Sequence, residues 1–101
     1  MYKLKYLPIA QKDLKNIINY IANHLKAPQA ALNLVTTFDN SISRLQQFPY
    51  SCQVYQTVKP LKAEYRMLPV KNYLIFYVVA EGEIEIHRII YAKRDLENLL
   101  K

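Results

Sequence analysis

The spacing of apolar positions along the chain predicts a short strand followed by a helix. The first stretch, YKLKYL over residues 2–7, alternates polar and apolar side chains as a half-buried strand does. Pro8 ends this stretch and suits the first turn of a helix, where its missing N–H is harmless. Apolar side chains then recur every three or four residues, as on one face of a helix: Leu14, Ile17, Ile18, Ile21 and Leu25.

A second helix is predicted after the short break Lys26–Pro28. The pair Phe48–Pro49 marks its end. Because the break is so short, the two helices must run antiparallel as a helical hairpin. The single apolar face of such a hairpin needs a sheet to cover it. The apolar positions of the second helix are Ala31, Leu34, Val35, Phe38, Ile42 and Leu45.

The remainder of the chain predicts three strands joined by two-residue turns. The turns are KN at residues 71–72 and EG at residues 81–82, where Gly82 supplies the positive φ that such a turn needs. The middle strand, YLIFYVVA, is apolar on both faces and should be central. Pro69 places the end of the preceding strand at an edge or a bulge. The predicted strands are Glu64–Val70, Tyr73–Ala80 and Glu83–Ala92.

The predicted order β-α-α-β-β-β indicates one α+β domain over residues 1–101. In it, the helical hairpin packs on one face of a small, mostly antiparallel sheet. The N-terminal strand joins that sheet either at its edge or beside the central strand. Residues 93–101 have leucines at helical spacing and predict a short terminal helix.

Composition excludes several classes of function. The only glycine is Gly82, so there is no glycine-rich loop to cradle a phosphate or a dinucleotide. His24, Cys52 and His87 are far apart in the sequence, so we expect neither a metal site nor a cofactor. The lone cysteine fits a reducing cytoplasm, and no apolar run is long enough to cross a membrane.

The charge distribution predicts an anionic partner. The net charge is +6, and residues 1–80 contain ten basic side chains against three acidic ones. Such a field attracts nucleic acid, a ribosome or an acidic protein. The same excess of charge can also serve solubility alone.

The order of these segments resembles the ParE/RelE superfamily of toxins from bacterial type II toxin–antitoxin modules. The resemblance is given by PIAQKDLKNIINYI at residues 8–21 and, in the C-terminal half, by YRMLPVKNYLIFYVV and IHRIIYAKRDLENLL. The helix at residues 8–21 resembles the ParE-like, plasmid-stabilisation branch. The resemblance implies a cytoplasmic growth inhibitor without a cofactor. It also implies a cognate antitoxin that neutralises the toxin in a hetero-oligomer.

Two activities recur in this superfamily: poisoning of DNA gyrase, and metal-free cleavage of mRNA on the ribosome. RNA cleavage needs cations that stabilise the phosphorane and groups near neutrality that transfer protons. His87 or Tyr91 could transfer protons. The candidate phosphate ligands are Arg66, Arg88, Lys93 and Arg94.

Strict alternation along the last strand separates two of these candidates. It places Arg88 on the face of Ile84 and Ile86, which we expect to face the helices. It places His87 and Tyr91 on the opposite face, together with Glu85. His87 and Arg88 therefore could not serve one site unless a β-bulge intervened.

The resemblance to the RNA-cutting branch is incomplete. That branch typically has an arginine just after the start of the central strand, where this chain has YLI at residues 73–75. It also tends to have a tyrosine near the C-terminus, and residues 95–101 contain none. We therefore expect a toxin that acts on DNA gyrase by protein contact. A ribosome-dependent mRNA endonuclease is the alternative, and a non-toxic antitoxin- or nucleic-acid-binding module is a third.

Overall fold

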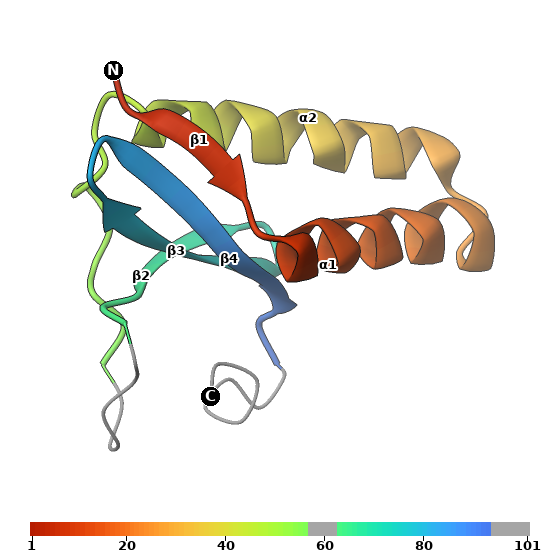
Figure 1. The fold of residues 1–101 in the computed structure, drawn as a ribbon. Helices are drawn as coiled ribbons and strands as arrows, with labels where there is room; N and C mark the ends of the chain where they lie inside the picture. The colour runs from red at the N-terminus through yellow and green to blue at the C-terminus, as the bar shows by residue number, and fades with distance from the viewer. Residues whose placement is uncertain (57–62, 94–101) are drawn as a thin grey trace.

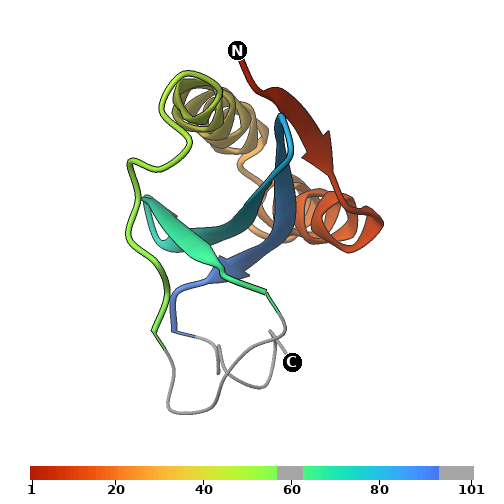
Figure 2. The ribbon, with the colours of Figure 1, turned by 60° about the vertical axis from the view of Figure 1, so that its left-hand side comes forward.

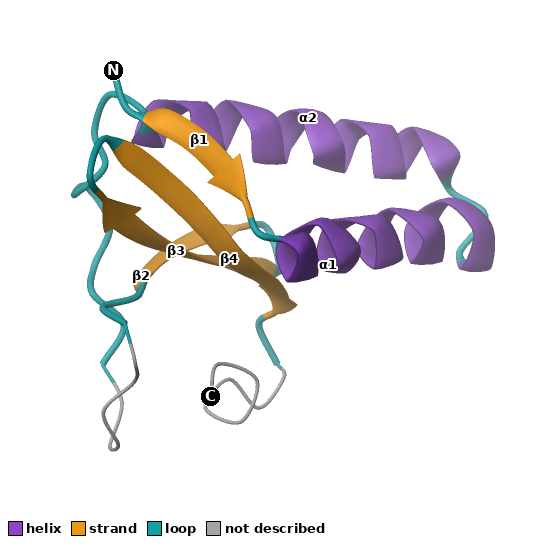
Figure 3. Cartoon of the chain, in the orientation of Figure 1, coloured by secondary structure: helices purple, strands orange, loops and turns teal. Residues whose placement is uncertain are grey.

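Two helices lie on one face of a four-stranded sheet in the structure, a computed structural model that describes residues 1–56 and 63–93 (Figures 1 and 3). The helical hairpin consists of α1 (Pro8–Asn19), a π-helical turn η1 (Tyr20–His24) and α2 (Pro28–Leu45). The α+β class and the predicted element order are confirmed. The strands are β1 (Lys3–Tyr6), β2 (Arg66–Val70), β3 (Tyr73–Ala80) and β4 (Glu83–Tyr91).

The sheet order is β1-β4-β3-β2, so β1 and β2 are the edge strands. β1 pairs in parallel with β4, whereas β4, β3 and β2 form an antiparallel meander. The prediction that β1 lies at an edge is right, and the alternative of a place beside β3 is wrong. Pro69 lies in an edge strand as expected.

The main core fills the space between the hairpin and the sheet. Both helices and the sheet contribute side chains to it, and Figure 2 looks nearly along the two helices. A smaller cluster on the opposite face, which we call the outer face, contains Phe76 and Ile90 with Tyr55, Tyr65 and Met67 against them. The largest fully buried side chains of the main core are Tyr77, Phe38, Ile42, Leu45, Ile75, Ile84 and Ile86.

The predicted first helix changes its form at its end. From Tyr20 the helix widens, and the N–H of Leu25 donates to the carbonyl of Tyr20, five residues back. Leu25 was predicted on the buried face but is 54% exposed, because the tip of the hairpin extends past the sheet (Figure 1). The strand predicted from Glu64 begins at Arg66, and the last strand ends at Tyr91. Most of the predicted terminal helix, residues 94–101, lies outside the described residues.

Candidate functional site

A β-bulge in β4 brings His87 and Arg88 to the same face of the sheet. Phe76 of β3 pairs with Arg88, but the next residue, Tyr77, pairs with Ile86, so His87 is the extra residue. Arg88 therefore shares the outer face with Phe76. The prediction that Arg88 faces the helices with Ile84 and Ile86 is wrong, because alternation does not continue through a bulge.

Arg88 reaches around the sheet edge to Asp13 in α1. Its Nε and one terminal nitrogen donate to the two oxygens of the Asp13 carboxylate at 2.7 and 3.0 Å. The backbone N–H of Ile89 donates to the same carboxylate at 3.0 Å, where β1 no longer covers the edge of β4. Both side chains are mostly buried, and the hydrogen bond to Asp13 raises the pKa of Arg88. Arg88 is therefore committed to an internal ion pair.

His87 lies in the middle of a chain of three polar side chains on the outer face. Its Nε2 is 3.2 Å from Oε1 of Glu85, and its Nδ1 is 3.3 Å from the hydroxyl of Tyr65. A carboxylate that orients an imidazole next to a hydroxyl is an arrangement suited to proton transfer. Sequence reasoning missed Tyr65. Its alternation with Met67 would have placed it on the outer face, but its contact with His87 depends on the bulge.

Arg66 lies in another part of the molecule, on the face toward the helices. It pairs across the sheet with Tyr77 and donates to the carbonyl of Cys52 at 2.7 Å. Its guanidinium lies 4.9 Å from the ring centre of Tyr50, and a weaker ion pair joins it to the exposed Glu64. These contacts hold the segment after α2 against β2, so Arg66 has a structural role.

The other candidates are also apart from His87. Tyr91 pairs with Tyr73 on the face toward the helices, with ring centres 5.7 Å apart, so its predicted place on the same face as His87 is wrong. The bulge is again the reason. Lys93 is exposed just beyond the end of β4. Arg94 lies outside the described residues. Of the six candidates, His87 and Arg88 thus share the outer face, and Arg88 and Tyr91 both line the cleft next to Asp13.

Tyr77 holds the segment after α2 against the sheet, because its buried hydroxyl donates to the carbonyl of Pro49 at 2.9 Å. We expect Tyr77→Phe to lower the free energy of unfolding by about 1–2 kcal/mol, because that carbonyl loses its donor. Urea unfolding measures the change. The matched control is Tyr20→Phe, whose ring is 53% exposed and which should change stability by less than about 0.5 kcal/mol. Equal effects of the two variants would contradict this role for the hydroxyl.

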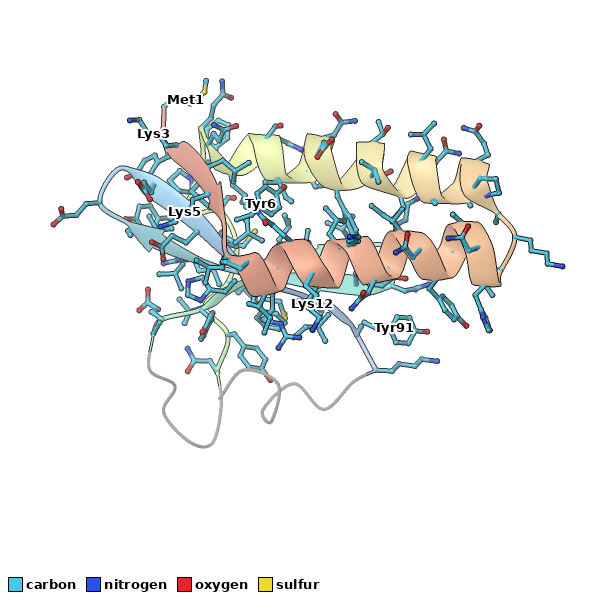
Figure 4. The ribbon with its side chains drawn as sticks, turned by 45° about the vertical axis from the view of Figure 1, so that its right-hand side comes forward. Met1, Lys3, Lys5, Tyr6, Lys12 and Tyr91 are labelled. Carbon is cyan, nitrogen blue, oxygen red and sulfur yellow. The ribbon has the colours of Figure 1, made fainter. Side chains whose placement is uncertain are left out.

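A groove of about 1000 Å³ lies under the part of the hairpin that extends past the sheet. Apolar side chains from α1, η1 and α2 form its roof, among them Ile17, Ile21 and Leu34. The β2–β3 turn and the facing ends of β3 and β4 form its other wall. Figure 4 shows Tyr91 beneath the first helix at this end of the sheet.

Other classes of site find no support in the described residues. Within residues 1–56 and 63–93, no three His, Cys, Asp or Glu side chains come together in a way that could hold a metal ion. No helix in those residues is long and apolar enough to cross a membrane. Lysines are spread over the first strand and helix, and Figure 4 shows Lys3, Lys5 and Lys12 on that side.

Two of the known structures similar to this chain have titles that name toxin–antitoxin systems. The "Chromosomal ParDE TA system from P. aeruginosa" is 25% identical, with a TM-score of 0.75 over 92% of this chain and 98% of that chain. The "RelB-RelE antitoxin-toxin complex from Methanococcus jannaschii" is 18% identical, with a TM-score of 0.49 over 96% and 99%.

The sequence comparison identifies the family. Comparison with curated protein sequences gives no match. Residues 4–96 match the family described as "ParE toxin of type II toxin-antitoxin system, parDE". This match spans nearly the whole chain, and it agrees with the structural similarity to the ParDE system. The chain therefore belongs to the ParE toxin family of type II toxin–antitoxin systems.

Proposed function

We propose that this chain arrests bacterial growth by binding and poisoning DNA gyrase in the cytoplasm, and that a cognate antitoxin neutralises it. The observation that supports protein contact over RNA cleavage is the state of the candidate phosphate ligands. Arg88 is bound to Asp13, and Arg66 to the carbonyl of Cys52. Two cations committed to internal contacts, on different faces of the sheet, do not form a phosphate site.

The antitoxin should cover two of the surfaces that the described residues leave open to a polypeptide. One is the apolar groove under the hairpin. The other is the outer edge of β1. Among the described residues, β1 pairs with β4 along one edge, and no strand pairs with its other edge. The net charge of +6 favours an antitoxin segment that is acidic or mixed in charge. Toxin and antitoxin would then form a hetero-oligomer.

Ribosome-dependent mRNA cleavage is a second candidate, favoured by the contacts of His87. A carboxylate, an imidazole and a phenol are within hydrogen-bonding distance in series, from Glu85 through His87 to Tyr65. If this series transferred the protons of RNA cleavage, loss of the imidazole would slow the reaction by about 10²–10⁴-fold. The two candidates therefore differ in a measurable way.

Pulse labelling after induction of the chain alone tests the proposal. We expect thymidine incorporation to fall before methionine incorporation, with transcripts intact, because a gyrase poison stops DNA synthesis first. His87→Ala and Tyr65→Phe should leave the toxicity unchanged, provided that circular dichroism shows both variants folded. An early fall of methionine incorporation with cleaved transcripts, abolished by His87→Ala, would establish the endonuclease instead. Harmless expression of the folded chain would point to a non-toxic binding module.

A further inference from the structure

The groove under the hairpin suits a helix and not a strand. Its roof is made of α1, η1 and α2, whose backbone groups are largely used within the helices. Its other wall is the end of the sheet, where the N–H of Ala92 already donates to the carbonyl of Asn72. A segment in this groove would therefore find few hydrogen-bond partners for its backbone. Its own N–H and C=O groups must bond to each other, as they do in a helix. Ile17, Ile21 and Leu34 would meet its apolar face.

The sheet end of the groove has a different chemistry from its roof. Among the described residues that line it, none is acidic, and Lys71 is the one with a full charge. Lys71 lies in the β2–β3 turn, two residues before Tyr73, and Tyr73 pairs with Tyr91 across the sheet. Tyr20 of η1 lines the same groove. Lys71 and three tyrosines therefore line this groove together.

The hydroxyl of Tyr73 stays protonated at neutral pH and can donate a hydrogen bond. Burial raises the pKa of Tyr73, and the nearby hydroxyls of Tyr91 and Tyr20 raise it further. Among the residues that line the adjoining cleft, the acidic one is Asp13, whose carboxylate is occupied by Arg88 and the N–H of Ile89. The sheet end of the groove therefore offers donors and positive charge, with no unpaired acid among the described residues around it.

We propose that this end of the groove is a carboxylate-binding subsite for an aspartate or glutamate on an amphipathic helix of the antitoxin. Lys71 supplies the charge, and the hydroxyls of Tyr20, Tyr73 and Tyr91 supply hydrogen bonds. The apolar roof gives such a helix affinity, and the subsite sets its direction and register, because it recognises a charge at one end only. The assignment of this helix to an antitoxin rests on the proposed function. The binding of an acidic helix in the groove is independent of that function.

A selection on displayed helices tests the subsite without knowledge of the antitoxin or of toxicity. The probe is a library of amphipathic helices about 30 Å long, or roughly 20 residues, with randomised side chains on both flanks of the apolar face. The bait is the folded full chain, either wild type or Lys71→Glu. We expect wild type to enrich Asp or Glu at one position near one end of the helix. Lys71→Glu should enrich Lys or Arg at that same position.

Two controls locate the binding. Ala30→Trp, which fills the groove from α2, should abolish recovery of the selected helices. Lys15→Glu makes the same charge change on the other side of the hairpin, in the cleft next to Tyr6 and Asp39, and should leave the enrichment unaltered. Enrichment that is insensitive to Ala30→Trp would overturn helix docking in the groove. Enrichment without an acidic position, or the same acidic position with Lys71→Glu, would overturn the subsite.

Affinity measurements on one selected helix make the test quantitative. Lys71→Gln should weaken binding by roughly tenfold, as loss of one charge-assisted contact does. Replacing the acidic residue of the helix by its amide should weaken binding equally. The two changes together should cost little more than either alone, because they remove the same interaction. Fully additive losses would overturn the pairing. A failed pulse-labelling test would leave this result intact, so the two proposals fail separately.

Discussion

Asp13→Ala should destabilise the protein by about 2–4 kcal/mol, although the substitution lies in a surface helix. The Asp13 carboxylate accepts hydrogen bonds from two nitrogens of Arg88 and from the N–H of Ile89. Its loss leaves a mostly buried guanidinium without this partner and a backbone donor without an acceptor. The expected cost is below that of a fully buried pair, because both side chains keep some contact with solvent.

A double-mutant cycle with Arg88→Met separates the ion pair from the rest of this effect. Each single variant should lower the midpoint of urea unfolding, and the double variant should lose less than the sum of the two. We expect a coupling energy of about 1–2 kcal/mol. Methionine fills a similar volume without a charge that needs a partner, which is why the double variant should recover stability. Additive losses would contradict the ion pair as the source of the stabilisation.

The same variant bears on function. A chain of this size has a free energy of unfolding of about 5–15 kcal/mol, so Asp13→Ala should stay mostly folded. If Arg88 could bind phosphate once it was free of Asp13, Asp13→Ala would raise RNA cleavage. If the chain acts on gyrase instead, Asp13→Ala should lower the toxicity only as far as it lowers the amount of folded protein.

The regular elements were predictable because their signals are local. Tyr73–Ala80 was predicted with the bounds that the structure gives, since an apolar run between two short turns has few other solutions. Gly82 has the positive φ that its turn requires. Lys71 has a positive φ of 55° in the other turn, which an Asn or Gly would have signalled more clearly. The hairpin follows in the same way from Pro28 and the helical spacing around it.

The arrangement around His87 was not predictable from alternation. Ile86 and Ile89 both enter the main core, and their spacing of three instead of two is the sequence trace of the bulge. That trace is ambiguous, because Ile90 is also apolar and continues the regular pattern from Ile86. The partner of Arg88 is 75 positions away, and no local signal links the two. Non-local pairing therefore decides the geometry of the site.

The bulge predicts an unusual response to single-residue deletions in β4. Deleting His87 leaves Arg88 opposite Phe76 and Ile86 opposite Tyr77, so every other side chain keeps its face. Deleting Glu85 instead shifts Ile84 to the outer face and Glu83 into the core against Val79. We expect the His87 deletion to cost about 1–2 kcal/mol, mainly through lost polar contacts. The Glu85 deletion should cost more than about 4 kcal/mol and prevent folding.

Circular dichroism and urea unfolding of the two deletion variants decide between the two registers of β4. His87→Ala is the matched control, because it removes the imidazole and keeps the extra residue. If the His87 deletion lowers the free energy of unfolding little more than His87→Ala does, His87 is the extra residue of the bulge. If this deletion unfolds the chain as the Glu85 deletion should, β4 continues in strict alternation. Arg88 would then face the helices, and His87 and Arg88 would lie on opposite sides of the sheet.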